Sequence, residues 1–269
     1  MLNETLTQHF GMTKDPFDRA IETTELFEFA AFKELEARLH YLIDRQGMGL
    51  VTGEVGAGKT SAVRRVLHSL HPGTHKAIYL VPSSLSIRDL YSSLAVALGL
   101  EPLSNRVKLV AQIRTEIERL VYAKKLRPVV AIDEVQLLRT EILDEIRILT
   151  NFDMDSTNLV TILLIGQTEF RRKMAFSAHE AFSQRLLIRY HLDGIKRSEV
   201  PDYITHQLHR AGVHIPLFTD GAIDALFQAS KGMLRPLNLL CSHALLAASL
   251  ERKPQATADH VHIAVSETT

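Results

Sequence analysis

The hydrophobic positions in the first two thirds of the chain follow two patterns that alternate along the sequence. Short apolar runs, typical of buried parallel strands, predict strands at residues 50–52, 77–81, 129–132, 159–165 and 187–191. Before and between them, apolar residues recur at helical spacing, which predicts helices at residues 29–45, 60–70, 87–98, 107–125 and 140–149. The alternation favours an α/β fold with a parallel, doubly wound sheet.

The pattern changes near Asp193 and Gly194, where the strand-like runs stop. Apolar positions at helical spacing then predict helices at residues 197–211, 220–230, 234–250 and 257–266. We therefore expect two domains: an N-terminal segment and α/β core at residues 1–193, and a small all-helical domain at residues 194–269.

Composition and charge indicate a globular protein and limit its partners. Hydrophobic residues make up 46% of the 269 residues and charged residues 23%. The 31 basic and 31 acidic residues give zero net charge, so binding to nucleic acid would need a local basic patch. The single cysteine, Cys241, excludes an internal disulfide and fits a reducing compartment. Without a signal peptide or an apolar run of membrane-spanning length, the sequence predicts a cytoplasmic protein with no membrane association.

A phosphate-binding motif stands between the first predicted strand and the helix that follows it. The sequence GEVGAGKT matches G-x-x-x-x-G-K-[ST], a loop whose backbone N–H groups close around a phosphate. Lys59 can reach the outer phosphates and Thr60 can bind Mg²⁺. The structural alternative, a glycine turn, gives the Lys-Thr pair no packing role. The expected nucleotide-binding residues are Gly53, Glu54, Val55, Gly56, Ala57, Gly58, Lys59, Thr60 and Ser61.

An acidic pair, Asp133 and Glu134, directly follows the predicted strand 129–132. In an open α/β sheet, ligands bind at the carboxyl ends of the strands, so the pair is expected to face the phosphate loop. Asp133 would then hold Mg²⁺, and Glu134 would orient and deprotonate the attacking water. A solvated acidic pair at a strand end is the alternative. The spacing of about 75 residues from the loop favours hydrolysis.

Three further polar residues occupy positions suited to a nucleotide site. Gln167 follows a predicted strand and can hydrogen-bond the γ-phosphate or the water, although it can also simply close a turn. Arg185 precedes the last predicted strand and is a candidate for an arginine supplied in trans, whereas Arg189 within that strand can be a solvent-facing residue. Arg235 opens an apolar helix beside Pro236 and can be aimed at the phosphates or be solvated.

Together, the segments GEVGAGKT, VVAIDE, LLIGQ, SQRLLIRYHL and GMLRPLNLL resemble the AAA+ ATPases, and within them the ExeA-like branch. The resemblance covers nearly the whole chain, beginning at HFGMTKDPF, which is similar to the branch's N-terminal segment near the adenine. It implies a P-loop core with sheet order 5-1-4-3-2 and a helical lid. It also implies that Gln167 is the first sensor, Arg185 the trans-acting finger and Arg235 the second sensor. Gln167 departs from the asparagine common at this position in AAA+ proteins.

Further properties follow from the resemblance alone. ATP, with Mg²⁺, would bind between neighbouring subunits of a homo-oligomer, which can be a ring or a helical filament. Relatives of the secretion type carry a transmembrane helix and a peptidoglycan-binding domain after the ATPase module, whereas this sequence ends at Thr269. That end favours the stand-alone transposition regulators similar to Mu B, TnsC and TniB, which assemble on duplex DNA and recruit a transposase. A secretion-type module acting on a protein client and a nucleotide-gated scaffold that hydrolyses poorly are the alternatives.

The sequence offers only local candidates for contact with DNA. Basic residues recur through 106–127, but Glu116 and Glu118 interrupt them, so a solvated amphipathic helix explains the pattern at least as well as a phosphate-binding face. In the transposon relatives, DNA contacts loops that correspond to residues 83–88 and 104–108. The candidates there for sequence-neutral phosphate contacts are Ser84, Ser104, Asn105, Arg106 and Lys108.

Overall fold

A computed structural model describes residues 2–18, 20–81, 86–153 and 157–268. Contacts divide the chain into two compact units. One unit comprises residues 34–53 and 59–192, and the other comprises residues 1–33, 54–58 and 193–269. Each unit is a set of residues that contact one another, and it does not follow the chain as a domain would. The domain division at residues 193 and 194 therefore remains a prediction.

The unit of residues 34–53 and 59–192 contains a five-stranded, all-parallel sheet in the order β2-β3-β4-β1-β5. This is the predicted order 5-1-4-3-2 read from the other edge, so the predicted sheet is confirmed. Its strands are β1 (Met48–Thr52), β2 (His75–Leu80), β3 (Arg127–Ile132), β4 (Thr161–Gly166) and β5 (Leu186–His191). Every residue of β1 and β4 is buried, as expected for central parallel strands, whereas the edge strands β2 and β5 are partly exposed.

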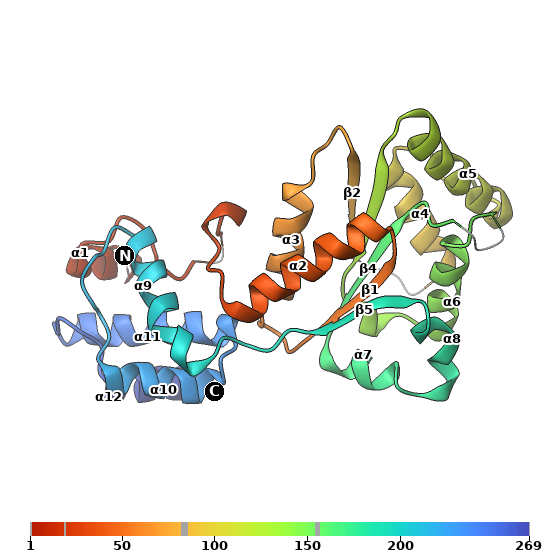
Figure 1. Ribbon diagram of the computed structural model, residues 1–269. Coiled ribbons are helices and arrows are strands. Elements are labelled where there is room, and N and C mark those ends of the chain that lie inside the picture. Colours follow the sequence, from red (N-terminus) through yellow and green to blue (C-terminus); the bar gives the residue numbers. More distant parts are fainter. Residues whose placement is uncertain (1, 19, 82–85, 154–156, 269) are drawn as a thin grey trace. The chain divides into compact units, whose positions relative to one another are not determined.

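Helices connect the strands around this sheet (Figure 1). They are α2 (Ala30–Arg45), α3 (Lys59–Ser69), α4 (Ile87–Leu98), α5 (Arg106–Glu118), α6 (Thr140–Leu149), α7 (Thr168–Lys173) and α8 (Glu180–Ser183). The predicted helix at 107–125 was too long. The regular helix ends at Glu118 and continues as the π-helical turn Arg119–Ala123, and Lys125 then adopts a left-handed backbone with φ 56° that cannot continue a helix. The short helix α7 was not anticipated.

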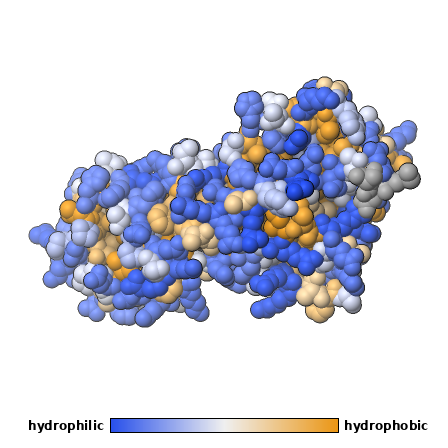
Figure 2. Space-filling model, viewed as in Figure 1, coloured by the Kyte–Doolittle hydropathy of each residue, from blue (hydrophilic) through white to orange (hydrophobic). Residues whose placement is uncertain are grey.

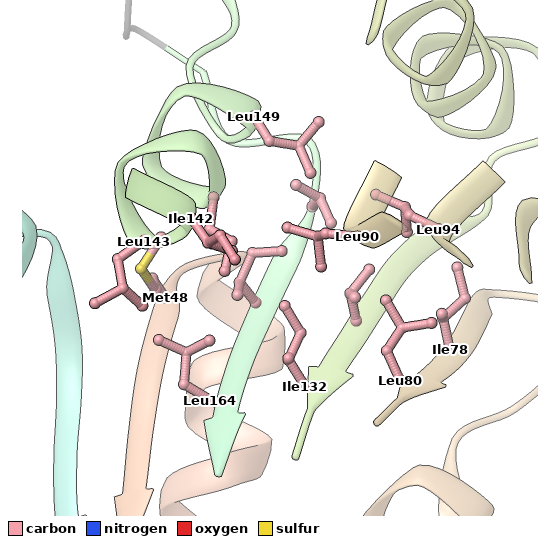
Figure 3. Packing of buried hydrophobic residues seen from close by; sticks show 14 of the residues in the cluster. Met48, Ile78, Leu80, Leu90, Leu94, Ile132, Ile142, Leu143, Leu149 and Leu164 are labelled. Atoms are coloured by element: carbon pink, nitrogen blue, oxygen red, sulfur yellow. The ribbon is translucent and has the colours of Figure 1, made fainter. Parts of the chain in front are cut away.

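One face of the sheet packs against α4, α5 and α6 in a large apolar core. Alternate strand residues such as Ile78, Ile132 and Leu164 point to this face and meet Leu94 from α4 and Ile142 from α6 (Figure 3). Each is at most 4% exposed. Burial of such a side chain contributes about 1.5–3 kcal/mol, which explains how short strands can hold the loops at their ends in place.

The opposite face carries the strand residues that alternate with these, including the fully buried Val51. A Cβ built on Gly49, in β1, would lie 2.5 Å from the Leu42 side chain of α2. The absence of a side chain at position 49 therefore lets α2 approach the sheet closely. Helix α3 buries Val63 and Val66, which fixes the helix that starts at Lys59.

The other unit is mainly helical. It contains α1 (Leu2–Phe10), α9 (Val200–Arg210), α10 (Asp220–Ser230), α11 (Leu234–Leu250) and α12 (Ala258–Thr268). Helix α11 packs against α1, α10 and α12, and its Cys241 is fully buried. The four helices predicted after residue 193 are present, whereas α1 was not anticipated because its residues are largely polar. Thr219 caps α10 by accepting from the backbone N–H of Ala222.

The N-terminal segment is tied to this helical unit by polar and aromatic contacts. Arg210 donates two hydrogen bonds to Glu25, at 2.8 and 3.1 Å, which lower the pKa of that carboxyl group. Phe27 packs edge-on against Tyr203 of α9 with ring centroids 5.6 Å apart. These contacts give the segment before α2 a defined path although it has little regular secondary structure.

The surface seen in Figure 2 is largely hydrophilic, with hydrophobic residues in separate patches. Some exposed apolar surface is normal for globular proteins. Within the part of the chain that the structure describes, no helix has both the length and the apolar character needed to cross a membrane.

Candidate nucleotide site

The phosphate motif begins at the end of β1 and runs into the first turn of α3. Lys59 is the first residue of α3, and its side chain is only 9% exposed. Its Nζ donates to the carbonyl oxygen of Gly53 at 2.8 Å, a contact that turns the ammonium back over the start of the loop. A buried ammonium beside a helix N-terminus makes this loop attractive to an anion, because both carry positive charge.

The middle of the motif, residues 54–58, requires glycine at two positions. Gly56 and Gly58 have φ values of 87° and 99°, in the left-handed region that side chains disfavour. Gly56 also accepts a hydrogen bond from the backbone N–H of Arg235 at 3.3 Å, and a Cβ on Gly56 would lie 2.7 Å from the Cβ of Arg235. The second residue of α11 therefore lies directly against Gly56 within this unit, while a role for the Arg235 side chain at the phosphates stays a prediction.

Asp133 accepts hydrogen bonds from three residues of the unit that contains the sheet. The Thr60 hydroxyl donates to its Oδ2 at 2.9 Å, the Tyr79 hydroxyl donates to the same oxygen at 2.6 Å, and the backbone N–H of Glu134 donates to Oδ1 at 2.8 Å. Asp133 is 5% exposed. Its backbone N–H donates to the carbonyl oxygen of Leu80, which extends the pairing of β3 with β2 by one residue. An alcohol and a carboxylate oxygen side by side are the hard donors that Mg²⁺ prefers, so these residues fit the predicted metal site.

Tyr79 is a site residue that the sequence-based interpretation missed. It lies on the edge strand β2, and burial, the hydrogen bond to Asp133 and the nearby carboxylates raise the pKa of its phenol. Residue 79 lies opposite Ala131 in the β2–β3 register, one position before the pair that ends both strands. The predicted sheet order already placed β2 beside β3, but this contact also depends on the register of the two strands, for which the sequence carries no signal.

Glu134 adopts a left-handed backbone with φ 52° at the start of the short turn η3 (Val135–Leu137). Its Oε2 accepts from the Nε2 of Gln136 at 2.5 Å and from the Nε2 of Gln167 at 3.5 Å. A non-glycine residue in this region costs of order 1 kcal/mol or more and is common where function fixes a side chain. The structure thus brings the two predicted residues Glu134 and Gln167 together, with Gln136 as an unforeseen third member.

Two of the arginines considered in the sequence, Arg185 and Arg189, lie beside or within β5. Arg185 is half-buried immediately before the strand, and Arg189 lies within it, where its guanidinium donates to the carbonyl oxygen of Ser183. The structure therefore gives Arg189 a local contact with the last residue of α8. Whether Arg185 reaches a neighbouring subunit is a property of an assembly and stays a prediction.

The candidates for DNA contact have local structural roles or exposed positions. Ser84 lies outside the described residues. Asn105 caps α5 by accepting from the backbone N–H of Lys108 at 3.1 Å, and Arg106 pairs with Glu145, which also accepts from Tyr91. Ser104 and Lys108 are exposed. The capping role and the ion pair account for Asn105 and Arg106 without a ligand, while a role in DNA contact stays a prediction for all five residues.

Comparisons with known proteins agree with this geometry. Residues 42–174 match a family model described as an AAA domain. The chain is 35% identical over 245 residues to General secretion pathway protein A of Aeromonas hydrophila, a match that covers 90% of this chain and 44% of that protein. The chain therefore spans less than half of the length of this relative.

Solved structures with low sequence identity share the fold. Cdc6p from Pyrobaculum aerophilum superposes with a TM-score of 0.73 at 11% identity, covering 94% of this chain and 70% of that one. Drosophila ORC bound to DNA gives a TM-score of 0.70 at 18% identity, covering 98% and 66%. The Thermotoga maritima RuvB branch migration motor gives 0.58 at 16% identity, covering 88% and 68%.

The loop, the acidic pair and the sheet order are those of one type of nucleotide-binding core. The sheet order and the helices around it match these structures over most of the chain, and the family model covers the strands that carry the loop and the acidic pair. Residues 42–174 accordingly match an AAA domain, the chain is similar to General secretion pathway protein A over 245 residues, and its fold is the AAA+ P-loop fold.

Proposed function

We propose that the protein binds ATP at Gly53–Thr60 and hydrolyses it with Glu134 as the general base. The observation that carries this proposal is the hydrogen bond of 2.9 Å between Thr60 and Asp133, with Glu134 next in the chain. It joins the phosphate loop to the acidic strand end that hydrolysis requires. The match to an AAA domain supports ATP as the nucleotide.

Each residue of the proposed site has its own role in ATP binding or hydrolysis. Loop N–H groups and Lys59 hold the phosphates, while Thr60 and Asp133 hold Mg²⁺, directly or through water. Bound Mg²⁺ supplies charge neutralisation at the phosphate oxygens. Glu134 accepts a proton from the attacking water, and Gln167 orients the same water or the γ-phosphate.

Two arginines complete the proposed site. Arg235, whose backbone contacts Gly56, provides the lid contribution to the phosphates. Arg185 of a neighbouring subunit stabilises charge on the γ-phosphate oxygens in the transition state. We therefore propose a homo-oligomer, ring or helical filament, with ATP at its interfaces, and a chain organised as a core at 1–193 and a lid at 194–269. A cytoplasmic location remains part of this proposal.

For the client, the 35% identity to General secretion pathway protein A favours a secretion-type ATPase module that acts on a protein. That identity extends over 90% of this chain.

A regulator of transposition, with duplex DNA and a transposase as partners, is the second candidate. One specific finding favours it: the fold is shared with a structure of ORC bound to DNA. Net charge is zero, so DNA binding would depend on ATP-driven assembly that multiplies weak contacts at each subunit. A transposase partner rests on the family resemblance alone.

Hydrolysis is tested by phosphate release with Mg·ATP, compared between the wild type and Glu134→Gln. Loss of a general base should lower kcat by about 100-fold or more. The variant should still bind a fluorescent ATP analogue with wild-type affinity. Equal phosphate release from both proteins would remove Glu134 from the mechanism.

The client is tested with the same Glu134→Gln variant, since it is expected to bind ATP and to hydrolyse it only slowly. Sedimentation velocity with ATP measures assembly, and random-sequence duplex DNA at low salt is then added. Co-sedimentation of DNA that requires ATP would favour the transposition role. Assembly that ignores duplex DNA would exclude that role and leave the secretion-type module.

A further inference from the structure

The side chain of Gln136 lies between the two residues proposed to act on the attacking water. Its Nε2 donates to Glu134 Oε2 at 2.5 Å, and its Oε1 accepts from the backbone N–H of Gln167 at 3.1 Å. The two contacts use the two different ends of one amide. Reversing the amide would place its oxygen against a carboxylate and its NH₂ against an N–H, so the chemistry of both partners fixes its orientation.

The backbone around Gln136 fixes where this amide can lie. Within the turn η3, the N–H of Leu137 donates to the carbonyl of Glu134 and the N–H of Leu138 donates to that of Val135, both at 3.0 Å. Val135, the neighbour of Gln136, is fully buried. Gln136 therefore projects from a turn that two backbone hydrogen bonds and the buried Val135 hold in place.

The end of β4 leaves space for the same amide. A Cβ built on Gly166 would lie 3.3 Å from Gln136 Oε1 and 2.8 Å from a methyl group of Val135. The φ of Gly166 is not in the left-handed region, since this residue is absent from the positive-φ glycines of the described chain. The glycine is thus explained by the close approach of η3, and not by a turn conformation.

We propose that Gln136 is a positioning residue that orients the Glu134 carboxylate and couples it to Gln167. The proposal rests on the proposed hydrolysis, because it assigns a role only if Glu134 is the general base. The two ends of the Gln136 amide join the backbone N–H of Gln167, at the end of β4, to the Glu134 carboxylate. In this role Gln136 acts through Glu134 and not on the nucleotide itself.

The first test replaces Gln136 by Met, which keeps the length of the side chain and removes both amide contacts. Misorientation of a catalytic group by about 1 Å costs up to about 100-fold, so kcat should fall by about 10- to 100-fold. The Kd for a fluorescent ATP analogue and the thermal midpoint should stay at wild-type values. The matched control is Gln228→Met, because Gln228 is exposed on α10, and it should hydrolyse ATP like the wild type.

The second test asks whether Gln136 acts through Glu134. Gln136→Met should lower the residual hydrolysis of Glu134→Gln by less than 2-fold, since no base remains to be positioned. The isosteric Gln136→Glu keeps an acceptor for Gln167 and places a carboxylate against Glu134. Its kcat should fall at least as far as that of Gln136→Met, because repulsion between the two carboxylates turns Glu134 out of position.

Three results would overturn the proposal: an unchanged kcat for Gln136→Met, the same fold-loss in the Glu134→Gln background, or a wild-type kcat for Gln136→Glu. Should Gln136→Met not fold, the kcat of the isosteric Gln136→Glu decides alone. Failure to assemble on DNA would count against the transposition role and leave these kinetic results standing. Wild-type turnover by Glu134→Gln would overturn both the proposed base and the positioning role.

Discussion

The hydroxyl of Thr60 donates a hydrogen bond of 2.9 Å to the carboxylate of Asp133, a residue 73 positions later in the chain. The contact links the first turn of α3 to the end of β3, and β4 separates β3 from β1 in the sheet. Two strand ends and a helix start therefore meet where a phosphate and its metal would bind. Four predictions concern the side chains of this site and of the core beneath it.

Replacement of Lys59 by Ala should weaken ATP binding. The Lys59 ammonium is buried and lies at the loop through its contact with Gly53, so it is already placed for a phosphate. Charge-assisted hydrogen bonds contribute about 1.5–3 kcal/mol, which corresponds to a rise in Kd of about 10- to 150-fold. Titration with a fluorescent ATP analogue measures it. Lys124→Ala, at an exposed lysine, is the control, and an unchanged Kd for Lys59→Ala would contradict the assignment.

The Tyr79→Phe substitution should change the response to Mg²⁺. The Tyr79 hydroxyl donates to the same Asp133 oxygen as Thr60, so its removal leaves that oxygen more negative and more available to a cation. We expect the Mg²⁺ concentration for half-maximal ATP hydrolysis to fall by about 3- to 10-fold. Tyr122→Phe, which alters an exposed tyrosine, should leave the Mg²⁺ dependence unchanged. A higher Mg²⁺ requirement in Tyr79→Phe would mean that the phenol helps to hold the cation.

Arg185→Ala and Glu134→Gln should complement one another if Arg185 acts in trans. Each variant alone should have low turnover, because one lacks the finger and the other lacks the base. In a mixed oligomer, some interfaces combine an intact Glu134 with the Arg185 of the other variant. Phosphate release from an equimolar mixture should therefore exceed the sum of the two separate rates.

The control for this mixing experiment is Arg189→Ala, at the arginine that donates to Ser183. Alone, it should hydrolyse ATP like the wild type because its guanidinium is engaged within its own chain. A mixture of Arg185→Ala and Glu134→Gln that releases only the sum of the separate rates would place Arg185 outside a shared site. Loss of ATP binding by Arg185→Ala would also contradict a trans-acting role.

Truncation of Leu164 to Ala should destabilise the core unit. Leu164 is fully buried in β4, where it packs between the sheet and the helices that cover it (Figure 3). Removing a buried leucine side chain costs about 2–5 kcal/mol through lost burial and the remaining cavity. Urea denaturation of the whole chain measures the change. Leu187→Ala, at a leucine of β5 that is 47% exposed, should cost far less.

Much of the fold could be predicted because its signals are local. Short apolar runs gave the five strands to within a few residues, and the phosphate motif placed a loop between β1 and α3. The sheet order came from the family resemblance. The errors lie where local patterns are weak: α1 is polar, α7 is short, and the helix after Asn105 ends at a π-helical turn that amphipathic spacing does not mark.

The sequence by itself determined which residues are candidates for chemistry at the proposed nucleotide site, since Lys59, Thr60, Asp133 and Glu134 stand in recognisable local patterns. Only the tertiary structure decided what surrounds them. Tyr79 reaches Asp133 across 54 residues, and Gln167 reaches Gln136 across 31, because parallel pairing places the ends of separate strands side by side. A hydrogen bond depends on distance and direction in space, which no periodicity along the chain encodes.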